Sequence, residues 1–426
     1  MASPPRCDLR TWNERRDRAP RPPPRPRPTP PNAIWRASIA NGVDCGRDHY
    51  ADRVAATRAA LDTAAVVLQP TLPSPFNDRL DALTRTPEGW VATMVFTAKQ
   101  FKPDQLPRFA RALLPFAESL GPMRATLLYV DPDATRRDTP DEPASWFKSV
   151  DVTDAMAQHL PAAAAEAAKL SRFLESDTPP TVAMGAHCLD GPCAYVERCS
   201  GLPGATPPAE DPPELVTPEV IDQACKIFAA FPRPWAYFDI ETVNPALPLR
   251  PGDTPYQVIS AQWALIIDDG QSTTTHTFLA DDLVGAEAAF VTSFLEATEG
   301  LATIFVWSPY ERQQLSSLAS RFPAFQAALN GRIGRLQDAL KLVGRLRPGR
   351  KTGLKSVSQA LVPDQPYSDL AIADGRVAGD LILVALDPAV PIDTREALRR
   401  DLIAYNVHDV KMMAAIVAVL CGGSPP

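Results

Sequence analysis

Two proline-rich stretches divide this chain of 426 residues, and they limit how it can fold more than any other feature does. Residues 20–31, PRPPPRPRPTPP, and residues 201–220, GLPGATPPAEDPPELVTPEV, hold too many prolines to continue a helix or a central strand. The first predicts an extended, polyproline-type linker, and the second predicts a domain boundary. We therefore expect an N-terminal domain over residues 1–200 and a C-terminal domain over residues 221–426. Two domains are also expected because a chain of this length is too long for one hydrophobic core.

The composition argues against several classes of protein. Hydrophobic residues make up 45% of the chain, but no run of about 18 uncharged apolar residues predicts a membrane span. The N-terminus is basic and lacks the apolar segment of a secretory signal, so we expect a cytoplasmic location and no membrane partner. The net charge of −7 argues against a uniformly basic nucleic-acid binder, although it leaves room for a local basic groove.

Both halves mix strand-like and helix-like segments, which predicts an α/β protein. In the C-terminal half the strand-like segments come first. They are residues 235–242, 258–268, 273–280 and 302–308, and the helix-like segments are residues 285–297, 310–322, 336–346 and 395–420. This order predicts a mixed sheet flanked by helices.

The strand-like segment WAYFDIET ends in two acids, Asp239 and Glu241. Residues two apart on a strand point to the same face, so these carboxylates would project together. Their repulsion makes a hard divalent cation such as Mg²⁺ or Mn²⁺ the natural partner. The pattern Asp-x-Glu is common in sequences, however, and a water-facing strand edge explains it equally well.

The last helix-like segment supplies a second set of candidates. Tyr405 and Asp409 are four residues apart and share one helical face. They are either part of the polar stripe of an amphipathic helix or a third carboxylate with a tyrosine hydroxyl beside it. Between the two sets, Glu311 begins a helix after a buried strand, and Asp338 lies in GRLQDALKLV.

This ordered set resembles the DEDD superfamily of 3′–5′ exonucleases, the DnaQ-like branch of the RNase H fold, in its tyrosine variant. Five segments agree in order and spacing with an uncharacterised bacterial family of such domains over about residues 235–420: YFDIETVNPALPL, VWSPYERQQL, GLKSVSQALVP, YSDLAIADGRVA and LIAYNVHDV. The resemblance implies an RNase H-like C-terminal domain that hydrolyses phosphodiesters at two Mg²⁺ or Mn²⁺ ions.

The resemblance also implies roles for individual residues. Asp239, Glu241 and Asp409 would hold the ions, and Tyr405 would orient the attacking water. Glu311 stands where many members have aspartate, and Asp338 is either a further ligand or a residue behind the ligands. Nucleic acid, most simply single-stranded DNA, is the expected partner.

A basic segment fits a polyanionic substrate. Residues 332–355 hold eight basic residues and one acid. They form either a solvated charged loop or a phosphate-contacting rim. Lys355, in the GLKS motif, is the first candidate for a phosphate contact, and Arg350 and Lys351 are the next.

Three of the seven cysteines lie within twelve residues: Cys188, Cys193 and Cys199. A fourth ligand must come from elsewhere, and Cys7 and Cys45 are the candidates. One early and three late cysteines resemble the iron–sulfur nucleases of the RecB/AddB type. The resemblance implies a [4Fe–4S] cluster on Cys7, Cys188, Cys193 and Cys199, with Zn²⁺ as the alternative.

The same resemblance implies a restriction-endonuclease-like α/β domain over residues 1–200. In that family an Arg-x-Asp precedes a Glu-x-Lys strand, and here Arg79, Asp81 and Lys99 match. Thr97 replaces the glutamate and cannot supply a carboxylate, so we expect this domain to have lost metal-dependent cleavage.

Two functions remain open at this point. The first is a metal-dependent nuclease with its chemistry in the C-terminal domain. The second is a non-catalytic nucleic-acid-binding or scaffold subunit of a larger defence or repair complex, and Thr97 favours it. In either case protein partners are possible.

Overall fold

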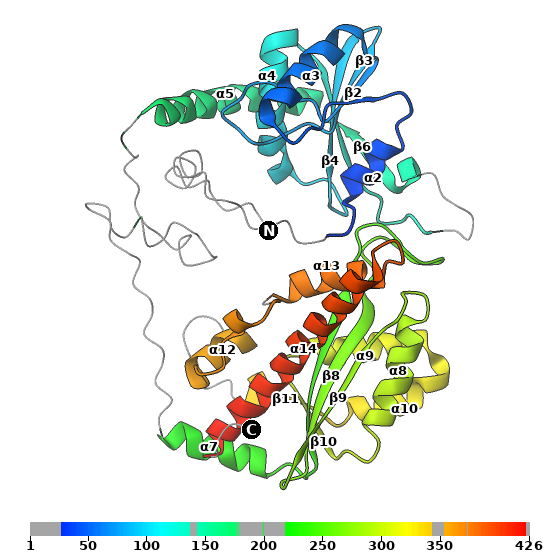
Figure 1. The fold of residues 1–426 in the computed structure, drawn as a ribbon, viewed down its shortest axis with the longest axis vertical. Coiled ribbons are helices and arrows are strands. Elements are labelled where there is room, and N and C mark those ends of the chain that lie inside the picture. Colours follow the sequence, from blue (N-terminus) through cyan, green and yellow to red (C-terminus); the bar gives the residue numbers. More distant parts are fainter. Residues whose placement is uncertain are drawn as a thin grey trace. The chain divides into compact units, whose positions relative to one another are not determined.

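The computed structural model of the chain describes residues 27–136, 143–176, 178, 199, 218–342, 353–372 and 374–422. By their contacts these residues form two compact units, each built on its own mixed β-sheet (Figure 1). The first unit takes the described residues within Thr29–Glu210 and Ala246–Tyr256, and the second takes those within Arg25–Pro28, Asp211–Pro245 and Gln257–Pro426. The protein is therefore a mixed α/β chain, and most of the expected boundary at 201–220 lies outside the described residues.

The first unit has a six-stranded sheet in the order β1-β2-β3-β4-β5-β6. The strands are β1 (Val43–Asp44), β2 (Val66–Leu68), β3 (Ala82–Thr86), β4 (Gly89–Phe96), β5 (Arg124–Val130) and β6 (Phe147–Asp151). β1 pairs parallel with β2, and β4 parallel with β5, while the other neighbours are antiparallel. In the sequence, residues 89–99 and 123–130 hold strand-like apolar runs, and these runs form β4 and β5.

Four α-helices of the first unit are described. They are α2 (Pro31–Ala37), α3 (Tyr50–Thr63), α4 (Leu106–Leu120) and α5 (Thr153–Glu175), with short 3₁₀ turns η1 (Pro103–Gln105) and η2 (Pro143–Trp146). α4 buries Phe109, Leu113 and Phe116, whose spacing of four and three residues places them on one face. They pack with residues of β4 and β5 in a single hydrophobic core.

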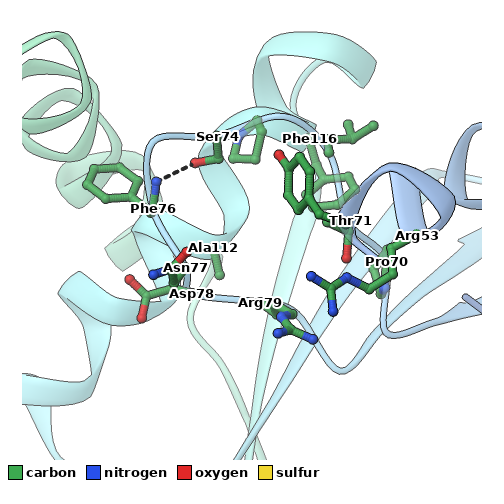
Figure 2. Close-up of a pocket in the computed structure, with 13 residues that line it drawn as sticks. Arg53, Pro70, Thr71, Ser74, Phe76, Asn77, Asp78, Arg79, Ala112 and Phe116 are labelled. Atoms are coloured by element: carbon green, nitrogen blue, oxygen red, sulfur yellow. Dashed lines mark hydrogen bonds between the residues drawn. The ribbon is translucent and has the colours of Figure 1, made fainter. Parts of the chain in front are cut away.

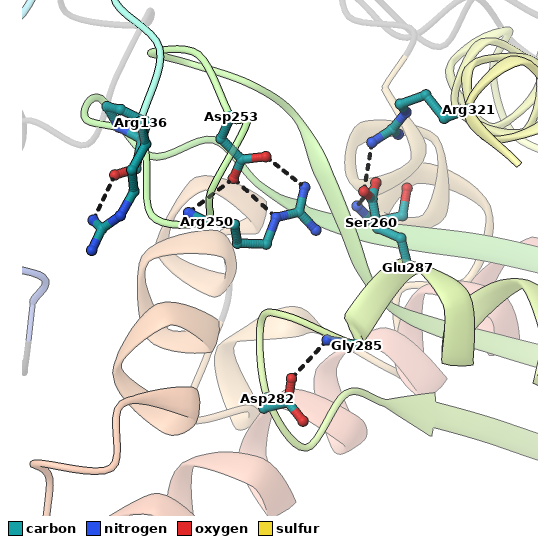
Figure 3. Close-up of polar contacts among 9 residues, drawn as sticks. Arg136, Arg250, Asp253, Ser260, Asp282, Gly285, Glu287 and Arg321 are labelled. Carbon is teal, nitrogen blue, oxygen red and sulfur yellow. Dashed lines mark hydrogen bonds and ion pairs between the residues drawn. The ribbon is translucent and has the colours of Figure 1, made fainter. Parts of the chain in front are cut away.

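The segment Ala246–Tyr256 follows β7 in sequence but packs as part of the first unit. Leu247 is buried against Val130 and Trp146. Asp253 holds Arg250 in an ion pair, with Nε 2.9 Å from Oδ2, as Figure 3 shows. The segment therefore contributes a buried side chain to the first unit.

The second unit has a five-stranded sheet in the order β11-β10-β7-β8-β9. The strands are β7 (Trp235–Val243), β8 (Ile259–Asp268), β9 (Thr273–Leu279), β10 (Thr303–Val306) and β11 (Leu336–Asp338). β7, β8 and β9 are antiparallel neighbours, whereas β10 and β11 run parallel to β7. The carboxyl ends of β7, β10 and β11 therefore meet at one edge of the sheet.

Helices cover both faces of this sheet (Figure 1). They are α7 (Pro218–Ala229), α8 (Ala286–Ala297), α9 (Tyr310–Arg321), α10 (Gln326–Ile333), α11 (Ala339–Leu342), α12 (Leu354–Leu361), α13 (Gly375–Leu386) and α14 (Ile392–Leu420), with 3₁₀ turns η4 (Pro323–Phe325) and η5 (Tyr367–Asp369). On the α8 side, Glu287 is buried, accepts the Ser260 N–H at 3.2 Å and pairs with Arg321 at 2.5 Å (Figure 3). These bonds tie α8 to β8 and α9.

The alternation of β7 decides where its acids point. Ala236, Phe238 and Ile240 pack against α8, α9 and α10, while Trp235 and Tyr237 pack against α7 and α14. Asp239 and Glu241 continue the second series, and so they face α14.

The expected strands and most of the expected helices of this half are confirmed, but the expected helix over residues 336–346 is wrong at its start. Leu336–Asp338 forms the edge strand β11, and only Ala339–Leu342 is helical among the described residues of that segment. The apolar spacing of LQDALKLV fits a helix. The segment begins as a strand because the parallel pairing of Leu336 with Ile304 extends the sheet.

Candidate metal centre

Three carboxylates converge between β7 and α14. Asp239 and Glu241 come from the end of β7, and Asp409 comes from the middle of α14. Each offers an oxygen that lies within 4.8 Å of the others, and among the described residues no other group of three such side chains comes together. These are three of the residues that the sequence predicted as metal ligands.

The three acids are shielded from solvent and repel one another. Glu241 is 9% exposed and Asp409 5%. Burial, followed by the negative charges of Asp409, Glu241 and Glu311, raises the pKa of Asp239 well above its ordinary value. Burial and the charge of Asp409 do the same to the pKa of Glu241. A carboxylate cluster of this kind is held ionised at neutral pH only by a compensating positive charge.

Two neighbouring side chains fix the orientation of the carboxylates. Asn406 donates from Nδ2 to Oδ2 of Asp239 at 2.6 Å, and Tyr367 donates its hydroxyl to Oδ1 of Asp409 at 2.5 Å. Neither residue was among the site candidates read from the sequence. Tyr367 lies 42 residues before its partner, so spacing gives no signal, whereas Asn406 adjoins Tyr405 and could have been found by asking which helix positions face β7.

Tyr405 is buried on α14 beside the acids. A side chain at Gly375, the first residue of α13, would place its Cβ 3.6 Å from the Tyr405 hydroxyl and 3.8 Å from both Glu241 carboxylate oxygens. The helix start is therefore within reach of both groups, and Asp374 caps it by accepting the N–H groups of Arg376 and Val377. Burial, followed by the nearby carboxylates, raises the pKa of Tyr405, so its hydroxyl stays protonated.

Lys355 brings a positive charge to the cluster. Its Nζ lies 4.8 Å from the ring centroid of Tyr405 and 5.0 Å from that of Tyr367. Its charge lowers the pKa of Asp239, opposing the effect of burial and of the neighbouring acids. The expected contacts Arg350 and Lys351 lie outside the described residues.

Glu311 and Asp338 lie at the same edge of the sheet without joining the triad. Glu311 is buried in the first turn of α9, where Ser308 Oγ lies 3.4 Å from its carboxylate. Burial raises the pKa of Glu311 to about 7. Asp338 ends β11 and accepts the Lys341 N–H at 2.9 Å. Glu311 is close enough to raise the pKa of Asp239, so it borders the cluster, whereas Asp338 acts on Glu311.

The residues present fit a divalent cation. All three converging donors are carboxylates, the ligand type that Mg²⁺ and Mn²⁺ prefer. The Oδ1 atom of Asn406 is buried and has no hydrogen-bond partner among the described residues, although its Nδ2 is bonded to Asp239. An unpaired buried acceptor beside three acids is expected where a cation and its ordered water complete the site.

The first unit has no comparable acidic cluster among its described residues. Asp81 is buried just before β3, where it pairs with Arg36 and accepts the Val95 N–H at 2.8 Å. Thr97 and Lys99 are exposed after β4, and Lys99 Nζ lies 5.3 Å from the Tyr256 ring centroid.

The expected cysteine site falls mostly outside the described residues, which do not include Cys7, Cys188 or Cys193. Cys199 is buried. Cys45 is buried in the core of the first unit, and its burial raises the pKa of its thiol. The iron–sulfur cluster and its zinc alternative therefore stay predictions.

One described helix, α14, is long and apolar enough to cross a membrane by length and composition alone. Its most apolar window is 61% buried within the protein, and it carries the buried Asp409. Core helices commonly pass the same test, so this single helix is weak evidence for a membrane span.

Comparison with known proteins adds one match. A family model described as a domain of unknown function, DUF2779, matches residues 236–348. The matched stretch includes Asp239, Glu241, Glu311 and Asp338 and ends before α14. No curated protein matches the chain.

Proposed function

We propose that the second unit is a divalent-metal-dependent nuclease of the DEDD type, a 3′–5′ exonuclease with an RNase H-like fold. The observation that carries the proposal is the convergence of Asp239, Glu241 and Asp409 to within 4.8 Å with the buried Tyr405 on the same helix face. The mixed five-stranded sheet with helices on both faces also supports it, because that is the architecture which the family resemblance implies.

The three carboxylates would hold the cations, with Glu311 at the border of the site. Divalent ions bound there would supply the positive charge that stabilises the attacking water oxygen and the departing oxygen of the phosphodiester. Asn406 and Tyr367 keep two of the carboxylates in fixed orientations, so their oxygens need little rearrangement when a cation binds. This prepositioning is the contribution of the protein scaffold.

Tyr405 acts in this proposal by orienting the nucleophilic water. Its raised pKa keeps the hydroxyl neutral, so it serves as a hydrogen-bonding group and not as a base. Lys355, close to the Tyr405 ring, is placed to contact a phosphate oxygen of the bound strand. Tyr310, partly exposed in the first turn of α9 and hydrogen-bonded to Thr242 at 2.7 Å, offers an aromatic face for a nucleobase.

The alternative is a non-catalytic nucleic-acid-binding subunit. The observation that favours it is confined to the first unit, where Asp81 is paired with a cation and Thr97 offers no carboxylate. The second unit keeps its acids together, so we assign the chemistry there.

A cleavage assay separates the two. Single-stranded DNA and RNA labelled at the 5′ end or at the 3′ end are incubated with Mg²⁺, with Mn²⁺ or with EDTA. We expect metal-dependent shortening from the 3′ end that Asp239→Asn abolishes and Asp81→Asn keeps. Equal activity of the wild type and Asp239→Asn, or none in the wild type with either metal, would overturn the proposal.

A further inference from the structure

The first unit contains a polar pocket that the proposed chemistry does not use (Figure 2). The start of α3 supplies Tyr50 and Arg53, the loop between β2 and β3 supplies Thr71, Ser74 and Arg79, and α4 closes the side with Phe116. Three separate segments thus meet around one hollow.

Two arginines face this pocket with like charges. In Figure 2 the guanidinium groups of Arg53 and Arg79 lie near one another. Burial, followed by the positive charges of Arg53 and Arg36, lowers the pKa of Arg79. Arg53 is held through Nη1 on the Arg47 carbonyl oxygen at 3.2 Å, while its buried Nε has no hydrogen-bond partner within the part of the chain that the structure describes. Bringing guanidinium groups together is unfavourable unless an anion lies between them.

One acid, Asp78, lines the pocket and another, Asp81, lies near it, and both are already paired with other cations. Asp78 accepts from Nε of Arg111 at 2.7 Å, and Asp81 pairs with Arg36. Within the part of the chain that the structure describes, neither carboxylate forms an ion pair with Arg53 or Arg79. The pocket therefore presents positive charge that these acids do not neutralise.

Neutral donors and a helix end add to the positive field. Ser74 Oγ accepts the Phe76 N–H at 3.1 Å, so its own hydroxyl proton can be donated elsewhere. The first turn of the 14-residue α3 borders the pocket, and the His49 side chain does not cap it. A helix N-terminus carries partial positive charge and favours an anion nearby.

We propose that this pocket binds a phosphate group of a nucleic-acid strand. Paired guanidinium forks match the oxygens of a phosphate, and the hydroxyls supply further donors. The choice of a nucleic acid as the carrier rests on the proposed function of the second unit, but the pocket itself requires no metal and no cleavage. The first unit is then a strand-binding module.

The test measures binding without cleavage. The full chain in EDTA is titrated against a fluorescent single-stranded oligonucleotide at several salt concentrations. We expect Arg53→Gln with Arg79→Gln to weaken binding roughly tenfold and to reduce the salt dependence by about one to two phosphate contacts. Arg58→Gln removes an exposed arginine further along α3 that does not line the pocket, and it should bind like the wild type.

Two additions keep the result decisive. Arg53→Lys with Arg79→Lys retains the charge and should bind with intermediate affinity, which guards against loss through misfolding. Inorganic phosphate at millimolar concentration should compete with the oligonucleotide in the wild type and not in the glutamine double variant. Wild-type affinity in the folded glutamine double variant, or phosphate binding at the pocket without any effect on the oligonucleotide, would overturn the proposal. Because no metal is present, these outcomes are independent of whether the second unit cleaves.

Discussion

Each unit buries an aspartate at a β-strand, and the two aspartates have opposite surroundings. Burial raises the pKa of Asp81, and the Val95 N–H, Arg36 and Asn32 offset part of that rise. Asp239 meets further carboxylates, which add to the effect of burial. Neighbouring groups of the protein partly compensate the negative charge of Asp81. Asp239 belongs to a cluster of carboxylates whose combined negative charge needs an added cation.

The comparison distinguishes carboxylates that stabilise the fold from carboxylates that serve a function. A carboxylate matched by an arginine contributes to packing and orientation, while unmatched carboxylates held close together cost stability and persist where they serve binding or catalysis. Thr97 of the first unit offers no carboxylate, and a single aspartate cannot by itself form a cation site.

Neutralising each aspartate gives the largest expected contrast. Asp239→Asn should lower the cleavage rate by roughly a thousandfold or more, as removal of an essential catalytic group commonly does. Asp81→Asn should leave the rate per folded molecule unchanged. Single-turnover cleavage with both variants measures this, and a comparable loss of rate in both would break the distinction between the units.

The same variants should shift stability in opposite directions. In metal-free buffer at neutral pH, Asp239→Asn removes a carboxyl group whose ionisation the folded chain disfavours, and it should raise the free energy of unfolding by about 1 kcal/mol. Asp81→Asn deprives Arg36 of its charged partner and should lower it by roughly 1–3 kcal/mol. Urea unfolding reports both values. Destabilisation by Asp239→Asn would show that this acid too is balanced within the protein.

Replacing each of the two tyrosines at the cluster by phenylalanine should affect a different measured quantity. Tyr405→Phe should lower the turnover rate by about 10²–10⁴ with little change in Mn²⁺ affinity, because its hydroxyl orients the water. Tyr367→Phe removes a hydrogen bond to Asp409 and should weaken Mn²⁺ binding by about 10–100-fold. Rates at saturating metal and Mn²⁺ titrations distinguish the roles, and identical profiles would contradict them.

The raised pKa of the Glu311 carboxyl predicts a pH dependence of stability in the second unit. A group with a higher pKa in the folded chain binds more protons there than when unfolded, so stability falls as pH rises through the interval between the two values. For Glu311 that interval runs from 4.5 to about 7. The melting temperature of the metal-free protein should fall over this range, and Glu311→Gln should flatten the fall.

Added Mn²⁺ should oppose this fall in stability with rising pH. It competes with protons for the carboxylates, so its stabilising effect should be larger at pH 7.5 than at pH 5. Thermal unfolding at both pH values measures the difference. A shift of the same size at both values would mean that the raised pKa values do not belong to the binding groups.

Substitutions that test the close packing of α13 on β7 should have the smallest effects, and these effects are on stability. A Cβ at Gly379 would lie 2.9 Å from the Thr242 carbonyl oxygen, so Gly379→Ala should destabilise the protein by roughly 1–3 kcal/mol. Gly331→Ala, in α10 with nothing near its Cβ, should instead stabilise it by about 0.5–1 kcal/mol. Chemical denaturation of both variants checks the pair, and a neutral Gly379→Ala would show that the contact yields easily.

The sequence predicted the parts of this structure that depend on local patterns. Alternation along WAYFDIET correctly placed Asp239 and Glu241 on one face, and the helical spacing of Tyr405 and Asp409 correctly placed them together on α14. The sequence wrongly placed Asp338 in a helix, because β11, the strand that contains it, forms only by pairing with β10. Tyr367 was missed because its contact with Asp409 depends on how η5 packs against α14, which no local pattern encodes.

The central claim is that the acids of the second unit form a divalent cation site, and a Mn²⁺ titration of the full chain followed by electron paramagnetic resonance tests it most directly. We predict saturable binding to the wild type and to Asp81→Asn, with loss of that binding in Asp239→Asn and in Asp409→Asn. Binding that survives in both second-unit variants, or no saturable binding to the wild type, would contradict the claim.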